Sequence, residues 1–277
     1  MDSMEKLHQS ELKLMKDVIT IFNSNNIRYF LGYGTLLGAV RGHGFIPWDD
    51  DVDLFVPRDD FERFKDLADS IVSYPYKVTG NVKDESVSPH TFILRVEDSK
   101  HKFAIEKNGK NEVHNVWLDI FPIDGMPRNK IVRNTLFVRF RLLYMMLRIA
   151  RSSKMGTSTN AERSTLEKIG IALNEVFNIG DRLSTRKIVD RFDKIRMRYP
   201  YERSEYVCPY TIDYKEKCLC KKSWFGNGIK CLFEDTEFVI PENSDAMLTQ
   251  FYGEYMELPP IDKRKPKHSI LFLTEEE

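Results

Sequence analysis

The chain has 277 residues, of which 42% are hydrophobic and 30% are charged. This composition is ordinary for a folded globular protein and excludes wholesale disorder. Lysine plus arginine and aspartate plus glutamate each number 42, so the net charge is zero. Bulk charge therefore does not indicate a nucleic-acid or acidic-polymer partner.

The opening segment, MDSMEKLHQSELKLMKD, lacks the apolar core of a signal peptide. The chain also lacks an uncharged apolar stretch of about 18 or more residues, the length that a spanning helix needs. We therefore expect a cytoplasmic protein whose four cysteines are reduced.

A glycine turn follows the first predicted elements. Apolar residues recur at three- and four-residue steps over residues 3–26, which predicts an amphipathic helix, and Ile27–Leu31 predicts a strand. The strand leads into Gly32-Tyr33-Gly34-Thr35, and the apolar residues 35–41 predict a short buried helix ending at Arg41. Helix-start N–H groups favour anions, and glycine lets a ligand approach the backbone closely. Gly34 and Thr35 are thus candidate phosphate-binding residues.

An acidic block, WDDDVDLFV, occupies residues 48–56 and runs into an apolar strand. Side chains alternate between the two faces of a strand. If the strand begins at Asp49, then Asp49, Asp51 and Asp53 share one face and Asp50 lies on the other. Three carboxylates on one face repel each other unless a hard cation lies between them, which predicts a Mg²⁺ or Mn²⁺ site.

A third candidate carboxylate lies about seventy residues further along. The segment NVWLDIFPIDG over residues 115–125 predicts an apolar strand that contains Asp119 and ends in a turn at Asp124-Gly125. A lone carboxylate in such a strand is costly to bury unless it is paired or bound to metal. Asp119 is therefore predicted to join the acidic block. The elements between are a helix over 58–68, strands over 76–79, 92–96 and 103–105, and a hairpin turn at Asn108-Gly109.

The middle of the chain is predicted to be helical. Residues 130–151 form the most apolar segment, and its basic residues fall in one stripe on a helix: Lys130, Arg133, Arg141, Arg148 and Arg151. Burial with a basic edge is the favoured interpretation, and peripheral contact with the inner face of a membrane is the alternative. Residues 160–177 and 183–198 predict further amphipathic helices.

The C-terminal part carries the cysteines and a basic run. Nine, one and ten residues separate Cys208, Cys218, Cys220 and Cys231, unlike the C-x₂₋₄-C pairs of zinc sites. Buried free thiols are favoured over structural Zn²⁺. The basic run 263–268 is either a solvated segment or a cover over substrate phosphates, with His268 as its candidate binding residue.

Four motifs together resemble the LicD family, which includes fukutin and fukutin-related protein. They are GYGTLLGAVR, IPWDDDVDL, LDIFPIDG and YGEYMELPP, and they occur in family order across nearly the whole chain. The resemblance implies an α+β, nucleotidyltransferase-like fold with a mixed sheet, flanking helices and a helical insertion. Gly34-Thr35 then matches the family turn, Asp51 and Asp53 the metal pair, and Asp119 the third acid.

The resemblance also implies the reaction and its partners. Family members move a phospho-alcohol, such as phosphocholine or a polyol phosphate, from a CDP-activated donor to a glycan hydroxyl on lipopolysaccharide, teichoic acid or capsule. The acceptor can be lipid-linked. Asp51, Asp53 and Asp119 would be catalytic and hold the cation, with Asp119 as ligand or general base, whereas Gly34, Thr35, Arg41, Asp49 and His268 would contact substrate.

Three regions are expected: a catalytic core at 1–128, a helical segment at 129–200, and a C-terminal part at 201–277 that completes the active site and the acceptor region. Two other functions stay open. A metal-dependent glycosyltransferase also uses a D-x-D motif, although the preceding glycine turn argues against it. A non-catalytic family member is the other, although all three acids are present.

Overall fold

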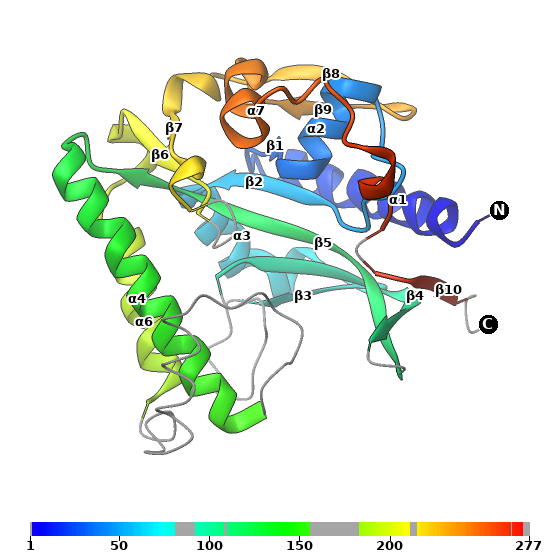
Figure 1. Cartoon of the computed structure of the whole chain (residues 1–277), viewed down its shortest axis with the longest axis horizontal. Coiled ribbons are helices and arrows are strands. Elements are labelled where there is room, and N and C mark those ends of the chain that lie inside the picture. The colour runs from blue at the N-terminus through cyan, green and yellow to red at the C-terminus, as the bar shows by residue number, and fades with distance from the viewer. Residues whose placement is uncertain are drawn as a thin grey trace.

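The computed structural model describes residues 2–80, 92–107, 110–155, 183–210, 215–266 and 268–273. It confirms an α+β fold in which helices surround a mixed, curled sheet (Figure 1). The helices described are α1 (Ser3–Ser24), α2 (Tyr33–Gly42), α3 (Arg58–Ile71), α4 (Lys130–Met155), α6 (Thr185–Arg196) and α7 (Ser244–Tyr252). The predicted helix at 160–177 and the turn at Asn108-Gly109 lie outside the described residues.

The sheet is built around one long strand, β5. The strands are β1 (Phe30–Leu31), β2 (Asp53–Pro57), β3 (Tyr76–Gly80), β4 (Leu94–Lys107), β5 (Lys110–Met126), β6 (Tyr206–Cys208), β7 (Cys220–Lys221) and β10 (Ile270–Leu273), with β8 (Ile229–Phe233) and β9 (Thr236–Ile240) forming a separate hairpin. Strand β2 is parallel to β5, and β4 and β6 are antiparallel to it. The order β1-β2-β5-β4-β10 therefore brings the C-terminal strand to the same sheet as the glycine turn.

The amphipathic pattern of α1 explains its packing. An Asp2 and Glu5 capping box begins the helix, which satisfies backbone N–H groups that would otherwise lack partners. Its apolar stripe is buried, and the helix contacts β4, β5 and β10. At its end, Phe22 meets Phe64 of α3 edge to face, with ring centroids 4.9 Å apart. This packing fixes the C-terminal end of α1 against α3.

The predicted turn at Asp124-Gly125 is wrong. Strand β5 continues through Met126, because β6 pairs with residues 124–126 and extends the ladder. An added Cβ at Gly125 would lie 2.2 Å from the carbonyl oxygen of Tyr199. The glycine here permits a close approach of two backbone segments rather than a change of direction.

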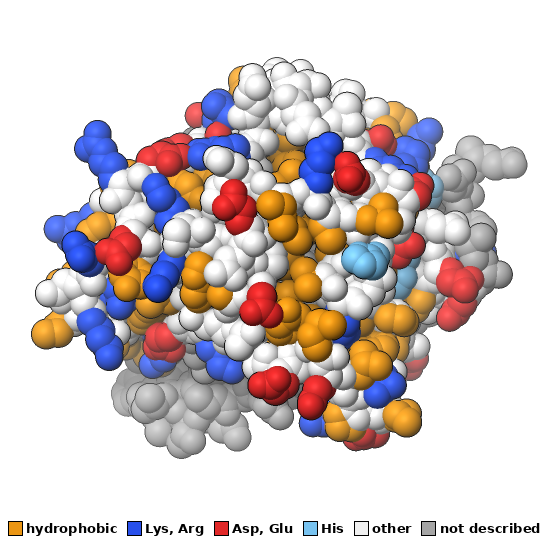
Figure 2. Space-filling view, turned by 90° about the horizontal axis from the view of Figure 1, so that it is seen from above, with side chains coloured by type: hydrophobic (Ala, Val, Ile, Leu, Met, Phe, Trp, Pro, Cys, Tyr) orange, Lys and Arg blue, Asp and Glu red, His pale blue; other side chains and the backbone are white. Residues whose placement is uncertain are grey.

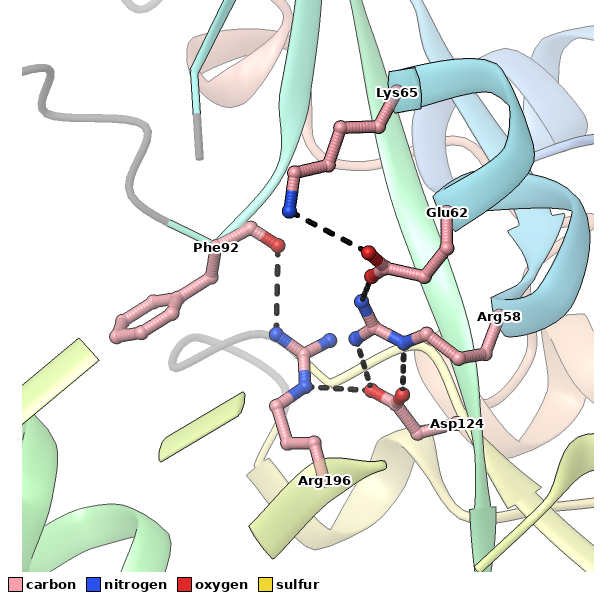
Figure 3. A network of polar contacts seen from close by, with 6 residues as sticks. All are labelled: Arg58, Glu62, Lys65, Phe92, Asp124 and Arg196. Carbon is pink, nitrogen blue, oxygen red and sulfur yellow. Dashed lines mark hydrogen bonds and ion pairs between the residues drawn. The ribbon is translucent and has the colours of Figure 1, made fainter. Parts of the chain in front are cut away.

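Asp124 instead joins a buried ionic network (Figure 3). Arg58 donates two hydrogen bonds to its carboxylate, at 2.6 and 3.0 Å, and Arg196 donates a third at 2.5 Å. Burial alone would raise the pKa of Asp124, but the charges of Arg196 and Arg58 outweigh it and lower the pKa. The network ties α3, β5 and α6 together through groups that are at most 5% exposed.

Helix α4 confirms the predicted burial of one apolar face. Its buried side chains include Phe137, Phe140 and Leu147, and it packs beside α6 (Figure 1). Within the basic stripe, Arg133 is buried and donates to the carbonyl oxygen of Pro127. Other apolar side chains of α4 remain exposed: Ile131, Val132, Val138, Leu142 and Met146. The alternative of membrane contact through this segment stays a prediction.

Among the described residues, every helix falls short of the length and apolarity required to cross a bilayer. On the face that Figure 2 shows, acidic and basic side chains are interspersed with apolar ones. The described part of this face therefore does not present a single-sign field of the kind that attracts a polyanion.

The boundaries of the three expected regions stay a prediction. Strands β6 and β10, from residues 201–277, nevertheless pair directly with β5 and β4 of the expected core. The C-terminal part is thus joined to the core sheet by backbone hydrogen bonds, and it can place side chains at the acidic block.

Candidate functional site

The acidic block is a loop rather than the start of a strand. Strand β2 begins at Asp53, so residues 49–52 do not follow the alternation expected of extended backbone. Asp50 consequently does not point away from its neighbours. One carboxylate oxygen from each of Asp49, Asp50 and Asp51 lies within 4.8 Å of the other two. The prediction that Asp50 lies on the opposite face is wrong, because the strand starts four residues later than the pattern suggested.

Asp53 and Asp119 lie side by side on neighbouring strands. They are register partners in the parallel β2–β5 pair, so their side chains leave the sheet on the same face. Both are buried, with 8% and 7% of their surface exposed. Two residues further along each strand, Phe55 and Phe121 share this face and pack on Tyr33 of α2, at 4.6 and 5.2 Å between ring centroids. The face that carries the two acids is therefore the face next to the glycine turn.

Arg95 of β4 holds the Asp119 carboxylate. Its Nε and Nη2 atoms each donate a hydrogen bond of 2.7 Å to one carboxylate oxygen. The guanidinium carbon lies 4.2 Å from the ring centroid of Trp117, so the cation is also stacked on an aromatic face. A bidentate pair leaves a second lone pair on each oxygen. Asp119 is thus fixed in direction while keeping the capacity to bind a cation.

The glycine turn contacts the acids directly. Helix α2 begins at Tyr33, two residues before the predicted start. The hydroxyl of Thr35 accepts a hydrogen bond of 2.9 Å from the backbone N–H of Asp53. An added Cβ at Gly34 would lie 2.2 Å from a carboxylate oxygen of Asp49, so only glycine admits this carboxylate at the positive end of the helix. The carboxylate of Asp49 therefore lies over the glycine turn, a contact that the spacing of the acids in the sequence did not predict.

Helix α1 approaches the acidic loop with two polar side chains. The Nε2–H of His8 donates to the carbonyl oxygen of Asp49 at 2.8 Å, and its ring stacks on Phe45. Burial lowers the pKa of His8 more than its acidic surroundings raise it. One turn further along, Glu11 is only 2% exposed. Burial, and then the charges of the aspartates at 49–51, raise the pKa of Glu11 well above its ordinary value.

The C-terminal segment reaches the same loop. The Nδ1 atom of His268 lies 2.6 Å from a carboxylate oxygen of Asp50. His268 lies two residues before the start of β10, whose pairing with β4 fixes this part of the chain. The structure thus brings His268 to the acidic loop, although 218 residues separate it from Asp50.

A pair of arginines lies near the acids. Burial lowers the pKa of Arg41, and the like charge of Arg264 lowers it further, whereas Asp49 and Tyr252 act in the opposite direction. Arg41 also donates to the carbonyl oxygen of Tyr255 at 3.5 Å. Two neighbouring guanidinium groups beside a carboxylate loop suit a bound phosphate, whose charge would offset their mutual repulsion.

The four cysteines do not converge as metal ligands among the described residues. Cys208, Cys218 and Cys220 are buried and form no disulfide, and Cys231 contacts the carbonyl oxygen of Ala39. Burial raises the pKa of the Cys208 and Cys220 thiols, which favours the protonated form over the thiolate that zinc requires. The geometry agrees with the favoured interpretation of buried thiols, and bound zinc stays an untested alternative.

The sequence missed three residues that the structure places at the site: Glu11, Asp50 and Arg95. A signal for Glu11 existed, because the apolar stripe of α1 includes Leu7 and Leu14, and position 11 lies between them on the same helical face. A charged residue at a core position points to a partner in the interior. Arg95 carried no comparable signal, because its partner is set by strand register.

Comparison with known proteins gives a consistent result. Residues 26–144 match the family model described as LicD/FKTN/FKRP, nucleotidyltransferase domain. The chain is 28% identical over 245 residues to the lipopolysaccharide cholinephosphotransferase LicD of Haemophilus influenzae, which covers 87% of each protein. It is 31% identical over 84 residues to human ribitol 5-phosphate transferase FKRP, covering 30% of this chain and 17% of that protein. An uncharacterized Rickettsia typhi protein is 39% identical over 127 residues, covering 46% of this chain and 38% of the relative.

Proposed function

The chain belongs to the LicD family of phospho-alcohol transferases, and on that premise we propose that it moves phosphocholine or a polyol phosphate from a CDP-activated donor to a hydroxyl of a cell-surface glycan. The similarity to a lipopolysaccharide cholinephosphotransferase over most of both chains makes phosphocholine and lipopolysaccharide the first donor group and acceptor to test. Teichoic acid and capsule are the other acceptor classes.

One observation carries the proposal. The acids at 49–51 converge, Asp49 and Asp53 lie against Gly34 and Thr35 of the glycine turn, and Asp119 is the register partner of Asp53. Helix-start N–H groups at this turn favour phosphate. Hard carboxylate oxygens are the ligands that Mg²⁺ and Mn²⁺ prefer. A carboxylate loop beside an anion-binding turn suits a cation that contacts a phosphate, so the residues present fit the ion.

The proposed roles follow from the contacts. Asp51 and Asp53 would hold the cation, with Asp119 completing the set, because Arg95 fixes the direction of its carboxylate as a ligand requires. When bound, the ion would neutralise charge on the donor phosphate oxygens. Gly34 and Thr35 would place donor phosphate against the start of α2.

The transfer itself is a displacement at phosphorus. The acceptor hydroxyl oxygen forms a bond to the phosphorus of the phospho-alcohol, and the bond from that phosphorus to the bridging oxygen breaks. CMP leaves with the electron pair, and the hydroxyl proton passes to a base or to solvent. Arg41, beside Arg264, would hold the departing phosphate, and His268 would close the C-terminal segment over the site.

The test is a donor panel. The protein is incubated with Mg²⁺ and CDP-choline, CDP-glycerol, CDP-ribitol or UDP-sugars, each with acceptor glycan, and CMP or UDP release is measured. We expect CMP release from one CDP-alcohol and acceptor-dependent turnover. UDP release from a UDP-sugar would identify a glycosyltransferase instead, and no release from any donor would support a non-catalytic protein.

Asp53→Asn tests the site. The variant keeps the size of the side chain and the backbone hydrogen bond from Asp53 to Thr35, so the fold should persist while transfer is abolished. Circular dichroism and the urea midpoint report the fold, and CMP release reports the activity. Near wild-type turnover in a folded Asp53→Asn protein would show that the site is assigned wrongly.

A further inference from the structure

A groove between α4 and α6 shares no residue with the acidic site. Its volume is about 640 Å³. Its lining side chains recur at three- and four-residue steps, and so occupy one face of each helix. They include Arg139, Leu142 and Met146 on α4, and Lys187, Ile188 and Arg191 on α6. The two helices pack beside each other without filling the space between these faces.

The walls of the groove are mainly apolar, and they continue into an exposed apolar stripe. Ile188 is buried, whereas Leu142 and Met146 are 50% and 36% exposed. At 100° per residue, three more exposed side chains fall on the same side of α4 as Leu142 and Met146: Ile131, Val132 and Val138. Exposed apolar side chains that gather in one patch, rather than singly, mark a contact surface.

The same groove carries positive charge. Arg139, Lys187 and Arg191 line it, and none of its described lining residues is acidic. Arg139 lies outside the basic stripe of α4, so it brings a cation to the apolar side of that helix. Helix α4 itself contains no aspartate or glutamate from Lys130 to Met155. Because the net charge of the whole chain is zero, this excess of positive charge is local.

Apolar side chains beside unopposed cations are complementary to an anionic lipid. An acyl chain removes the apolar wall from water, and the lipid phosphate meets the cations. A nucleic acid would meet the cations but leave the apolar stripe exposed. A second copy of the chain, related by two-fold symmetry, would bring the same cations against one another. Charge and apolarity together therefore favour a lipid as the occupant.

We propose that the α4–α6 groove docks the protein on an anionic membrane surface. One acyl chain of an anionic phospholipid lies in the groove, and the phosphate of that lipid lies against Arg139, Lys187 and Arg191. The exposed stripe of α4 then rests on the surrounding lipid. The inference rests on this surface alone and stands whether or not the chain transfers a phospho-alcohol.

Flotation of the full-length protein with vesicles tests the docking. The vesicles contain equal parts of phosphatidylglycerol and phosphatidylcholine, or phosphatidylcholine alone, at low and at high salt. We expect binding to the anionic vesicles that weakens at high salt, because salt screens exposed charges, and no binding to phosphatidylcholine alone. Absence of binding to the anionic vesicles overturns the inference.

A pair of charge variants locates the contact. The double variant Lys187→Gln/Arg191→Gln should bind anionic vesicles about 25-fold more weakly, since each cation near an anionic surface contributes roughly fivefold. Lys16→Gln/Lys230→Gln is the matched control, because it removes the same charge from α1 and β8, which lie apart from α4 and α6 (Figure 1). The control should bind as the wild type does, and equal weakening of the two variants would refute a role for the groove.

An apolar variant tests the acyl chain. Leu142→Glu should weaken vesicle binding by at least about tenfold, because a leucine that would be buried in lipid is lost. Val113→Glu, at a similarly exposed position of β5, should not. Phosphatidylglycerol with a photoreactive acyl chain should form adducts with residues of the groove in the wild type, and adducts confined to other parts of the chain would contradict the proposed position.

Two other occupants would give different results, and either would overturn the inference. If a second copy covers the groove, sedimentation should show a dimer that Leu142→Glu converts to a monomer, without vesicle binding. If another part of the same chain covers it, Leu142→Glu should lower the urea midpoint well below that of Val113→Glu, again without vesicle binding. Circular dichroism confirms that each variant is folded, and the charge variants decide the matter if Leu142→Glu is not.

Discussion

Replacing Arg95 by glutamine separates the cost in stability of burying the Asp119 carboxylate from the contribution of that carboxylate to cation binding. In the native protein both Asp119 oxygens accept a hydrogen bond of 2.7 Å from Arg95, and both side chains are 10% exposed. The variant leaves Asp119 buried, charged, and next to Asp53 in the strand register. The same change removes a positive charge from the place where a cation is expected to bind.

The magnitude follows from this geometry. Two unit charges about 4 Å apart interact by roughly 4 kcal/mol at an effective dielectric constant near 20, and removing one partner of a buried pair typically costs about 3–5 kcal/mol. We therefore expect the free energy of unfolding in EDTA to fall by about 3–5 kcal/mol. A divalent ion can then take over the neutralising role of Arg95, so Mg²⁺ should stabilise the variant more than the wild type. An ion at about 100 times its dissociation constant adds roughly 2.7 kcal/mol.

Urea denaturation with EDTA and with saturating Mg²⁺ measures both effects. Arg28→Gln is the control, because Arg28 is half exposed and pairs with Asp60 and Glu202 away from the acidic loop. It should lose about 1 kcal/mol or less and respond to Mg²⁺ as the wild type does. The reasoning is refuted if Mg²⁺ stabilises Arg95→Gln and the wild type equally, or if Arg95→Gln loses no more than the control.

Two further predictions concern the ionic network and the glycine turn. Asp124→Asn leaves two buried guanidinium groups without their anion, so the free energy of unfolding should fall by about 3–5 kcal/mol; an unchanged urea midpoint at pH 7 would contradict this. The folded-state pKa of Asp124 lies below its ordinary value of 3.8. The stability that its carboxylate contributes is therefore complete above pH 3.8 and is lost as the pH falls through the folded-state pKa. Asp124→Asn should not show this loss. Gly34→Ala places a Cβ 2.2 Å from Asp49 and should lower CMP release by about 100-fold through displacement of that carboxylate. Gly42→Ala, whose added Cβ meets nothing within 4 Å, should not, and equal activities would refute the steric argument.

The local elements were largely predictable because their signals are local. The stripe of α1, the helix after the glycine turn and the strand around Asp119 all follow from side-chain periodicity. Asp119 was predicted to join the other acids because a buried carboxylate in an apolar strand needs a partner. The strand register confirms that Asp53 and Asp119 lie side by side. That partner was harder to identify. Strand register decided that Arg95 lies opposite Asp119, and register depends on which segments pair across the sheet.

The acidic block shows where a local pattern misleads. Alternation over Asp49–Asp53 indicated a strand, yet the strand begins only at Asp53 and the three preceding acids converge. Asp124-Gly125 failed in the opposite way, because a dipeptide typical of turns is held extended by β6. In both cases tertiary pairing outweighed a preference of the isolated segment.

The sequence by itself predicted the resemblance to the LicD family and a metal and phosphate site, because both rest on residue types at fixed spacing along the chain: a glycine turn, an acidic block and a later aspartate. Only the tertiary structure decided which acids face one another and which cations accompany them. Glu11 reaches the loop from a helix, Arg95 from a neighbouring strand and His268 from the far end of the chain. The physical reason is the distance along the chain over which each effect acts. Periodicity and turn preferences act over a few residues, whereas the cost of a buried charge is settled by whichever groups the fold brings within a few ångströms of it.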